Sequence, residues 1–217
     1  VKRLFDHLEA TGEMDNTVII YTGDQGFMLG EHDYIDKRWM YEETLRMPFL
    51  VRYPARFKAG TVVEDIVNNV DYAPTILELA GVTSSDMPAQ FQGRSFVANM
   101  EGRTPADWPQ QTYYRYWMHM AHHDNPAHYG LRTKDHKLIF FYGLPLNAPG
   151  AQGQVIEPWL ELYDLARDPF EMNNVIQDPA YAAVLAEMKV ALLREKQRIG
   201  DEDEKYPELM AVRKALW

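Results

Sequence analysis

A continuous run of β-branched and aromatic residues at positions 17–22 (TVIIYT) constrains the fold more than any other segment. Runs of this kind are typical of a strand buried on both faces, as in a parallel sheet that helices cover. The amphipathic pattern of residues 2–12 predicts the end of a helix before this strand, and residues 48–54 (PFLVRYP) predict a second strand. A helix capped by Asp71 and ended by Gly81 is expected next. This order of elements predicts an α/β sheet.

The sequence pattern changes near residue 111. Residues 83–111 are rich in Ser, Pro, Gln, Gly and Asp and predict a long surface loop. Four strand-like segments follow and predict an antiparallel meander: 112–120, 129–133, 136–142 and 160–165. A long helix is expected from Asp178-Pro179 to Gly200. We therefore predict an α/β part over residues 1–110 and a small α+β subdomain, with an antiparallel sheet and a long C-terminal helix, over residues 111–217.

Composition excludes several classes of protein. The chain has 22 basic and 32 acidic side chains, a net charge of −10, and no run of Lys and Arg that would build the basic face of a nucleic-acid binder. No apolar stretch reaches the roughly 18 residues that a membrane span needs. Cysteine is absent, which excludes disulfides, cysteine-bound zinc and a cysteine nucleophile within these residues. The chain starts at Val1 without an initiator Met or a signal peptide, so we expect a processed piece or a fragment whose compartment is not readable.

The turn Gly23-Asp24-Gln25-Gly26 directly follows the first strand and carries the clearest candidate site. In open α/β sheets ligands bind beyond the carboxyl ends of strands. The carboxylate of Asp24 and the amide oxygen of Gln25 are hard donors suited to Ca²⁺ or Mg²⁺. Lys37 offers a cation for an anionic substrate group. The alternative interpretation is an ordinary turn, with Asp24 bonded to its own backbone and Lys37 solvated.

Histidine is concentrated between positions 119 and 136, where five of the seven lie: His119, His122, His123, His128 and His136. Clustered imidazoles bind transition metals, but the spacing M-H-M-A-H-H-D matches no familiar zinc pattern. Alternation along residues 112–120 would place His119 on the strand face opposite Met118 and Met120. We expect one or two of these histidines to be structural. His32, beside Glu31, is expected to be a packed loop histidine.

Several motifs occur in an order that resembles one known family. The run T-G-D-Q-G-F-M-L-G-E-H (22–32), then D-K-R-W-M-Y-E-E (36–43) and R-M-P-F-L-V-R-Y-P (46–54), is similar to the C-terminal half of the type I sulfatases of the alkaline-phosphatase-like superfamily. The later D-Y-A-P-T-I-L-E-L-A-G-V (71–82) and E-L-Y-D-L-A-R-D-P-F-E-M-N-N (161–174) also resemble that family. The group that includes iduronate and heparan sulfatases and their bacterial relatives is the most similar.

The resemblance implies roles for particular residues. Asp24 and Gln25 look like ligands of the active-site calcium, with Mg²⁺ as the other candidate, and Lys37 looks like the lysine that contacts the sulfate oxygens. Histidines of the C-terminal subdomain would lie at the rim of the substrate pocket, which makes His122 and His123 candidates for contact with a saccharide. Because Gln25 is a neutral ligand, it leaves the site less negative than a carboxylate would, which favours an anion beside the metal. The implied substrate is a sulfated saccharide or a small sulfate ester.

The family's nucleophile is a formylglycine made from a C/S-x-P-x-R motif, and this motif is absent from residues 1–217. We therefore expect the remainder of a sulfatase chain to supply it and expect no sulfatase activity from this chain alone. Two alternatives remain open. One is a phosphoester or phosphonate hydrolase of the same superfamily, and the other is a non-catalytic carbohydrate-binding or interaction module built from residues 112–217. Relatives are often periplasmic, secreted or lysosomal, but nothing in this sequence selects a compartment.

Overall fold

The computed structural model describes residues 1–217, with Ser84 described by its backbone alone. The chain divides into two compact units. The first comprises residues 1–24 and 47–110, and the second comprises residues 25–46 and 111–217. Residues 25–46, which we expected to belong with the first part, thus pack with the C-terminal part. Among the described helices, none combines the length and the apolar character that crossing a bilayer requires.

The first unit combines short helices with a two-stranded ribbon. Strands β1 and β4 pair antiparallel with Ile19 opposite Arg52. Its elements are α1 (Lys2–Ala10), β1 (Ile19–Thr22), β4 (Phe49–Arg52), α3 (Tyr72–Leu79) and α4 (Val97–Met100). The expected burial of β1 on both faces is wrong, because Tyr21 is 57% exposed and its register partner Leu50 is 66% exposed. An apolar run sets the strand conformation, but the neighbouring elements decide which of its faces are covered.

A small aromatic core holds the first unit together and includes part of the segment expected to be a surface loop. Residues 83–111 contain α4, and Val97 and Met100 are buried there against Phe57, Phe96 and Trp108. The Trp108 indole N–H donates to the Ile66 carbonyl at 2.9 Å. The polar composition of this stretch hid its few apolar anchors, so the prediction of a plain surface loop is wrong.

Asp71 stands before α3 as expected, but its side chain does not cap that helix. Instead, its carboxylate accepts from the backbone N–H of Asn68 at 2.8 Å and from that of Arg94 at 2.8 Å. Asn68 is the residue that starts the preceding turn, Asn69–Asp71, through a capping box with Asp71. The aspartate therefore stabilises the turn and ties it to the loop at Arg94.

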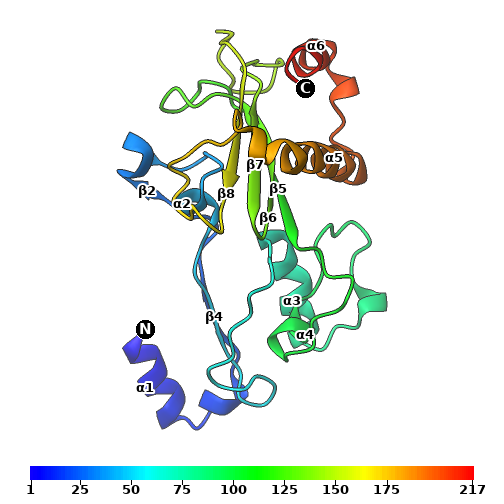
Figure 1. Ribbon diagram of the computed structural model, residues 1–217. Coiled ribbons are helices and arrows are strands. Elements are labelled where there is room, and N and C mark those ends of the chain that lie inside the picture. Colours follow the sequence, from blue (N-terminus) through cyan, green and yellow to red (C-terminus); the bar gives the residue numbers. More distant parts are fainter. The chain divides into compact units, whose positions relative to one another are not determined.

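The second unit is built on the predicted antiparallel meander. Its four strands are hydrogen-bonded in the order β5-β6-β7-β8, and Figure 1 shows α5 lying across this sheet. The elements are β5 (Gln111–Tyr116), β6 (His128–Thr133), β7 (His136–Phe141), β8 (Trp159–Asp164), α5 (Ala182–Ile199) and α6 (Pro207–Leu216). Asp178 accepts a hydrogen bond from the Ala180 N–H and caps the short 3-10 turn Pro179–Tyr181 that leads into α5, and Gly200 ends α5 with φ 75° as predicted.

The sheet of the second unit separates two hydrophobic clusters. Leu138 and Phe140 of β7 belong to the cluster on the side of α5, where Leu192 is buried. Their neighbours Ile139 and Phe141 point the other way and pack with residues of the segment 25–46. That segment contains β2 (Met28–Leu29), β3 (Ile35–Asp36) and α2 (Glu42–Leu45). Met40, fully buried, approaches β6 so closely that a Cβ on Gly130 would lie 2.5 Å from its sulfur.

A buried network of ions joins the C-terminal residues to the rest of the second unit. The carboxylate of Asp203, with no exposed surface, lies 3.0 Å from the Lys196 ammonium of α5 and 2.7 Å from the Arg213 guanidinium of α6. The Tyr129 hydroxyl of β6 donates to the same carboxylate at 2.6 Å. Burial lowers the pKa of Lys196 against the opposing pull of Asp203 and Asp201. This network makes α6 part of the folded core.

Candidate functional site

The turn after β1 carries the two predicted metal ligands. Asp24 is exposed and Gln25 is half-buried, and the Asp24 carbonyl accepts a hydrogen bond from the Asn69 side chain at 3.2 Å. The donor chemistry suits calcium, because both side chains offer oxygen. Calcium takes about six to eight oxygen ligands, so these two residues would be part of a larger ligand set. Their role as metal ligands stays a prediction.

Gly26 closes this turn for a reason that the sequence did not show. Its N–H donates to the Thr44 carbonyl at 2.9 Å, and a Cβ at this position would overlap the Glu43 carbonyl oxygen and lie 2.8 Å from that of Arg46. Glycine is therefore required by the close approach of the backbone of α2. The contact fixes the start of segment 25–46 against its end.

Lys37 lies half-buried between two residues with strained backbone. Asp36 has φ 95° and Arg38 has φ 85°, a left-handed region that residues with a Cβ rarely adopt. The carboxylate of Asp36 also pairs with the Arg38 guanidinium. Such strain persists only where the surroundings impose it, and it clusters at functional sites. The backbone around Lys37 is therefore held in an unusual shape.

His123 contacts the segment that carries Lys37. Its Nε2 lies 3.3 Å from Oδ2 of Asp36, and its backbone carbonyl accepts a hydrogen bond from the Tyr34 hydroxyl. The His123 side chain is 55% exposed, so it keeps a free face towards solvent. His122 is also exposed, and its carbonyl accepts from the Asn125 N–H at 3.1 Å. The structure thus brings His123 to the Lys37 segment, while the substrate roles of both histidines stay predictions.

Two other histidines of the cluster are structural, as expected. His119 is fully buried and accepts from the Ala127 N–H at Nδ1, so its Nε2 carries the proton towards the Gln154 carbonyl. Strand β5 ends at Tyr116, so the expected place of His119 on a strand face is wrong. Burial lowers the pKa of His128 to about 4, and its Nδ1 contacts the Pro126 carbonyl oxygen at 2.7 Å.

Among the described residues, the grouping of possible metal-binding side chains is His32, Glu43 and Glu171, and it does not involve the histidine cluster. The His32 ring stacks on Tyr41 with centroids 4.1 Å apart, which confirms the expected packed loop histidine, and its Nε2 lies 3.7 Å from Oε2 of Glu43. Glu171, however, already accepts from the Glu42 N–H at 2.7 Å and lies 2.6 Å from the Lys137 ammonium. A dication there would face a buried ammonium, so this grouping is better described as an ion cluster.

That cluster contains the charged residues that sequence reasoning missed. Lys137 is fully buried in β7 and pairs with Glu42 at 2.9 Å and with Glu171 at 2.6 Å. Burial alone would raise the pKa of Glu42, but Lys137 and Arg132 outweigh it and lower that pKa to about 2. Burial raises the pKa of Glu171 against the pull of Lys137. No local spacing signals these contacts, because Glu42 lies about ninety or more residues from its partners and Lys137 lies 34 residues from Glu171.

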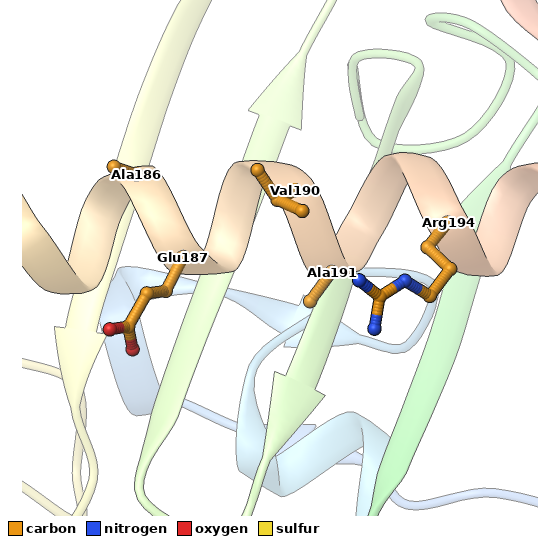
Figure 2. Close-up of a pocket in the computed structure, with 5 residues that line it drawn as sticks. All are labelled: Ala186, Glu187, Val190, Ala191 and Arg194. Atoms are coloured by element: carbon orange, nitrogen blue, oxygen red, sulfur yellow. The ribbon is translucent and has the colours of Figure 1, made fainter.

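A hollow of about 400 Å³ lies away from these residues. Its lining comes from α5 alone, as Figure 2 shows: Ala186, Glu187, Val190, Ala191 and Arg194. An indentation along one helix face offers few convergent polar groups, unlike a ligand pocket. We therefore do not place the candidate site there.

Comparison with known proteins identifies the family. A family model described as N-sulphoglucosamine sulphohydrolase, C-terminal, matches residues 30–198. The N-acetylglucosamine-6-O-sulfatase of Bacteroides thetaiotaomicron is 46% identical over 210 residues, which are 94% of this chain and 35% of that protein. The chain thus spans little more than a third of that relative.

Solved structures agree with this result. A protein solved in complex with its substrate D-glucosamine-2-N,6-O-disulfate is 42% identical, with a TM-score of 0.83 over 95% of this chain and 39% of that one. The phosphonate monoester hydrolase of Silicibacter pomeroyi is 28% identical, with a TM-score of 0.73 over 90% of this chain and 38% of that one. The resemblance drawn from the motifs and the expected alkaline-phosphatase-like fold are both confirmed, and the chain belongs to the N-sulphoglucosamine sulphohydrolase C-terminal family of sulfatases.

Proposed function

We propose that this chain is the C-terminal portion of a sulfatase that hydrolyses sulfate esters of saccharides, with a sulfated glucosamine as the substrate class. The observation that carries the proposal is the 42% identity over 95% of the chain to a protein solved with a glucosamine disulfate. The formylglycine nucleophile would come from outside residues 1–217.

The described residues would bind and orient the substrate. Asp24 and Gln25 would hold part of the calcium site, and calcium bound there would supply positive charge to the sulfate oxygens. The ammonium of Lys37 would stabilise negative charge that develops on the sulfate group in the transition state. The strained backbone at Asp36 and Arg38 supports this role, because it fixes the direction in which the Lys37 side chain leaves the backbone.

His123 would contact the saccharide rather than the sulfate. Its imidazole is held by Asp36 beside the Lys37 segment and keeps an exposed face that can hydrogen-bond a hydroxyl. Replacing His123 with Ala should therefore raise KM for a saccharide and leave a small aryl sulfate unaffected. Equal effects on both substrates would contradict a role in recognition. His122 is the less supported candidate, because it is exposed without such a contact to the Lys37 segment.

The experiment uses the complete protein that carries this chain, purified with calcium. Release of sulfate is measured from glucosamine 6-O-sulfate, from 4-nitrophenyl sulfate and, for the rival chemistry, cleavage of a phenylphosphonate monoester. We expect sulfate release from the saccharide, and a loss of about 10²–10³-fold in kcat for Lys37→Ala. The likeness to a phosphonate monoester hydrolase favours the rival activity, and cleavage of the phosphonate without sulfate release would refute the proposal.

A further inference from the structure

The peptide group between Arg38 and Trp39, one residue beyond Lys37, accepts two hydrogen bonds from residues far along the chain. The Tyr114 hydroxyl of β5 donates to the Arg38 carbonyl at 3.1 Å, and the Asn125 side-chain N–H donates to the same oxygen at 2.9 Å. A carbonyl oxygen has two lone pairs, so both are engaged. The two donors come from residues 76 and 87 positions further along the chain.

Both donors are themselves fixed. Asn125 is 1% exposed, its N–H donates to the His122 carbonyl at 3.1 Å, and its own carbonyl accepts from the Met120 N–H at 2.8 Å. Tyr114 is half-buried on β5, and burial raises the pKa of its hydroxyl, which keeps the proton that it donates. The two donor groups are therefore already in position to bind the Arg38 carbonyl.

The strain at Arg38 shows why such a pair matters. Its φ of 85° orients the carbonyl in a way that an ordinary extended or helical residue would not. A conformation that is unfavourable by itself needs contacts that over-determine it. If the carbonyl were released, the left-handed backbone of Arg38 would relax, and the peptide that joins Arg38 to Lys37 would move with it.

We propose that Tyr114 and Asn125 are positioning residues, which keep Lys37 in place through their hydrogen bonds to the carbonyl of Arg38. The inference rests on the proposed role of Lys37. It differs from the saccharide contact assigned to His123, because misplacing Lys37 affects every sulfate ester, whatever its alcohol. Small displacements of a catalytic group lower rates strongly.

The chain offers a matched control for the test. Tyr116 lies two residues along the same strand and therefore on the same face as Tyr114, and its buried hydroxyl has no hydrogen-bond partner among the described residues. Tyr114→Phe and Tyr116→Phe remove the same atom from neighbouring sites. The measured quantities are kcat and KM of the complete protein, with a saccharide sulfate and an aryl sulfate, and the thermal midpoint of each variant.

We expect Tyr114→Phe to lower kcat/KM about tenfold for both substrates, mainly through kcat, and Tyr116→Phe to change it less than about twofold. Asn125→Ala should act like Tyr114→Phe. The decisive measurement is Tyr114→Phe in a Lys37→Ala background, where the substitution should cost less than about twofold because nothing remains to be positioned. A purely structural tyrosine would cause the same loss in both backgrounds.

Two results would overturn the inference. One is equal effects of Tyr114→Phe and Tyr116→Phe, and the other is a full loss from Tyr114→Phe that persists without Lys37. An unchanged kcat/KM for Lys37→Ala alone would instead overturn the proposed role of Lys37, and this inference with it. The three outcomes are separate, so failure of the positioning role is distinguishable from failure of the proposed function.

Discussion

Asp203 should be among the most sensitive positions of the second unit. Its carboxylate is completely buried and is shared by the ammonium of Lys196, the guanidinium of Arg213 and the hydroxyl of Tyr129. The substitution Asp203→Asn keeps the shape and one of the two acceptor oxygens but removes the charge. The Lys196 ammonium, with a side chain 2% exposed, then loses its nearest counter-charge.

The size of the effect follows from the partners that remain. Removing one member of a buried ion pair typically costs about 3–5 kcal/mol. Asp201, whose carboxylate lies 3.3 Å from the same ammonium, offsets part of the charge, so we expect about 3 kcal/mol at pH 7. Deprotonation of Lys196 limits the part of the loss that comes from its ammonium to about 5 kcal/mol at pH 7, because the pKa of a free lysine is about 10.4. At pH 9 this limit falls to about 2 kcal/mol, and the loss should shrink accordingly.

Urea denaturation at the two pH values measures the free energy of unfolding. Tryptophan fluorescence suits this unit, because Trp39, Trp117, Trp159 and Trp217 all lie in it. The control is Glu204→Gln, since Glu204 also pairs with Arg213, at 3.2 Å, but its side chain is 62% exposed. That change should stay within about 0.5 kcal/mol. Equal losses from Asp203→Asn and Glu204→Gln, or a loss that does not shrink at pH 9, would refute the reasoning.

Four further predictions concern the site and its surroundings. Gly26→Ala should destabilise the second unit by about 2 kcal/mol, measured by urea denaturation, because the added methyl overlaps the Glu43 carbonyl. His128, whose pKa is about 4 in the folded state and about 6.5 in the unfolded state, should contribute full stability above pH 6.5 and lose about 3 kcal/mol as the pH falls from 6.5 to 4; a wild-type slope equal to that of His128→Gln would contradict this. In the complete protein, Asp24→Ala should weaken calcium binding in a calorimetric titration. The purified chain alone should release no sulfate from an aryl sulfate, and turnover by it would count against the proposal that the nucleophile lies outside residues 1–217.

The second unit was largely predictable because its signals are local. The four strands carry β-branched and aromatic residues between turn residues. Asp178 marks the 3-10 turn that leads into α5, and the left-handed Gly200 marks the end of α5. The first unit was less predictable. Exposure of Tyr21 depends on what lies over β1, and the buried Val97 is one apolar residue in a polar stretch. Periodicity carries neither kind of information.

The candidate site divides in the same way. The motif resemblance pointed to Lys37 and to the histidine-rich turn, but it did not reveal that His123 reaches Asp36. The contacts of Tyr114 with Arg38 and of Lys137 with Glu42 join segments 76 and about 95 residues apart. Such contacts depend on tertiary packing, and a single sequence contains no local signature of them.

Strand β7 separates two packing interfaces of the second unit. Residues of one parity, Leu138 and Phe140, face α5, and those of the other, Ile139 and Phe141, face the segment that bears Lys37. Substitutions at odd-numbered positions would therefore change the packing against the Lys37 segment, and they would leave the contacts with α5 unchanged. Substitutions at the odd-numbered positions should therefore lower both activity and thermal stability, because Ile139 and Phe141 are fully buried, whereas substitutions at the even-numbered positions should lower thermal stability.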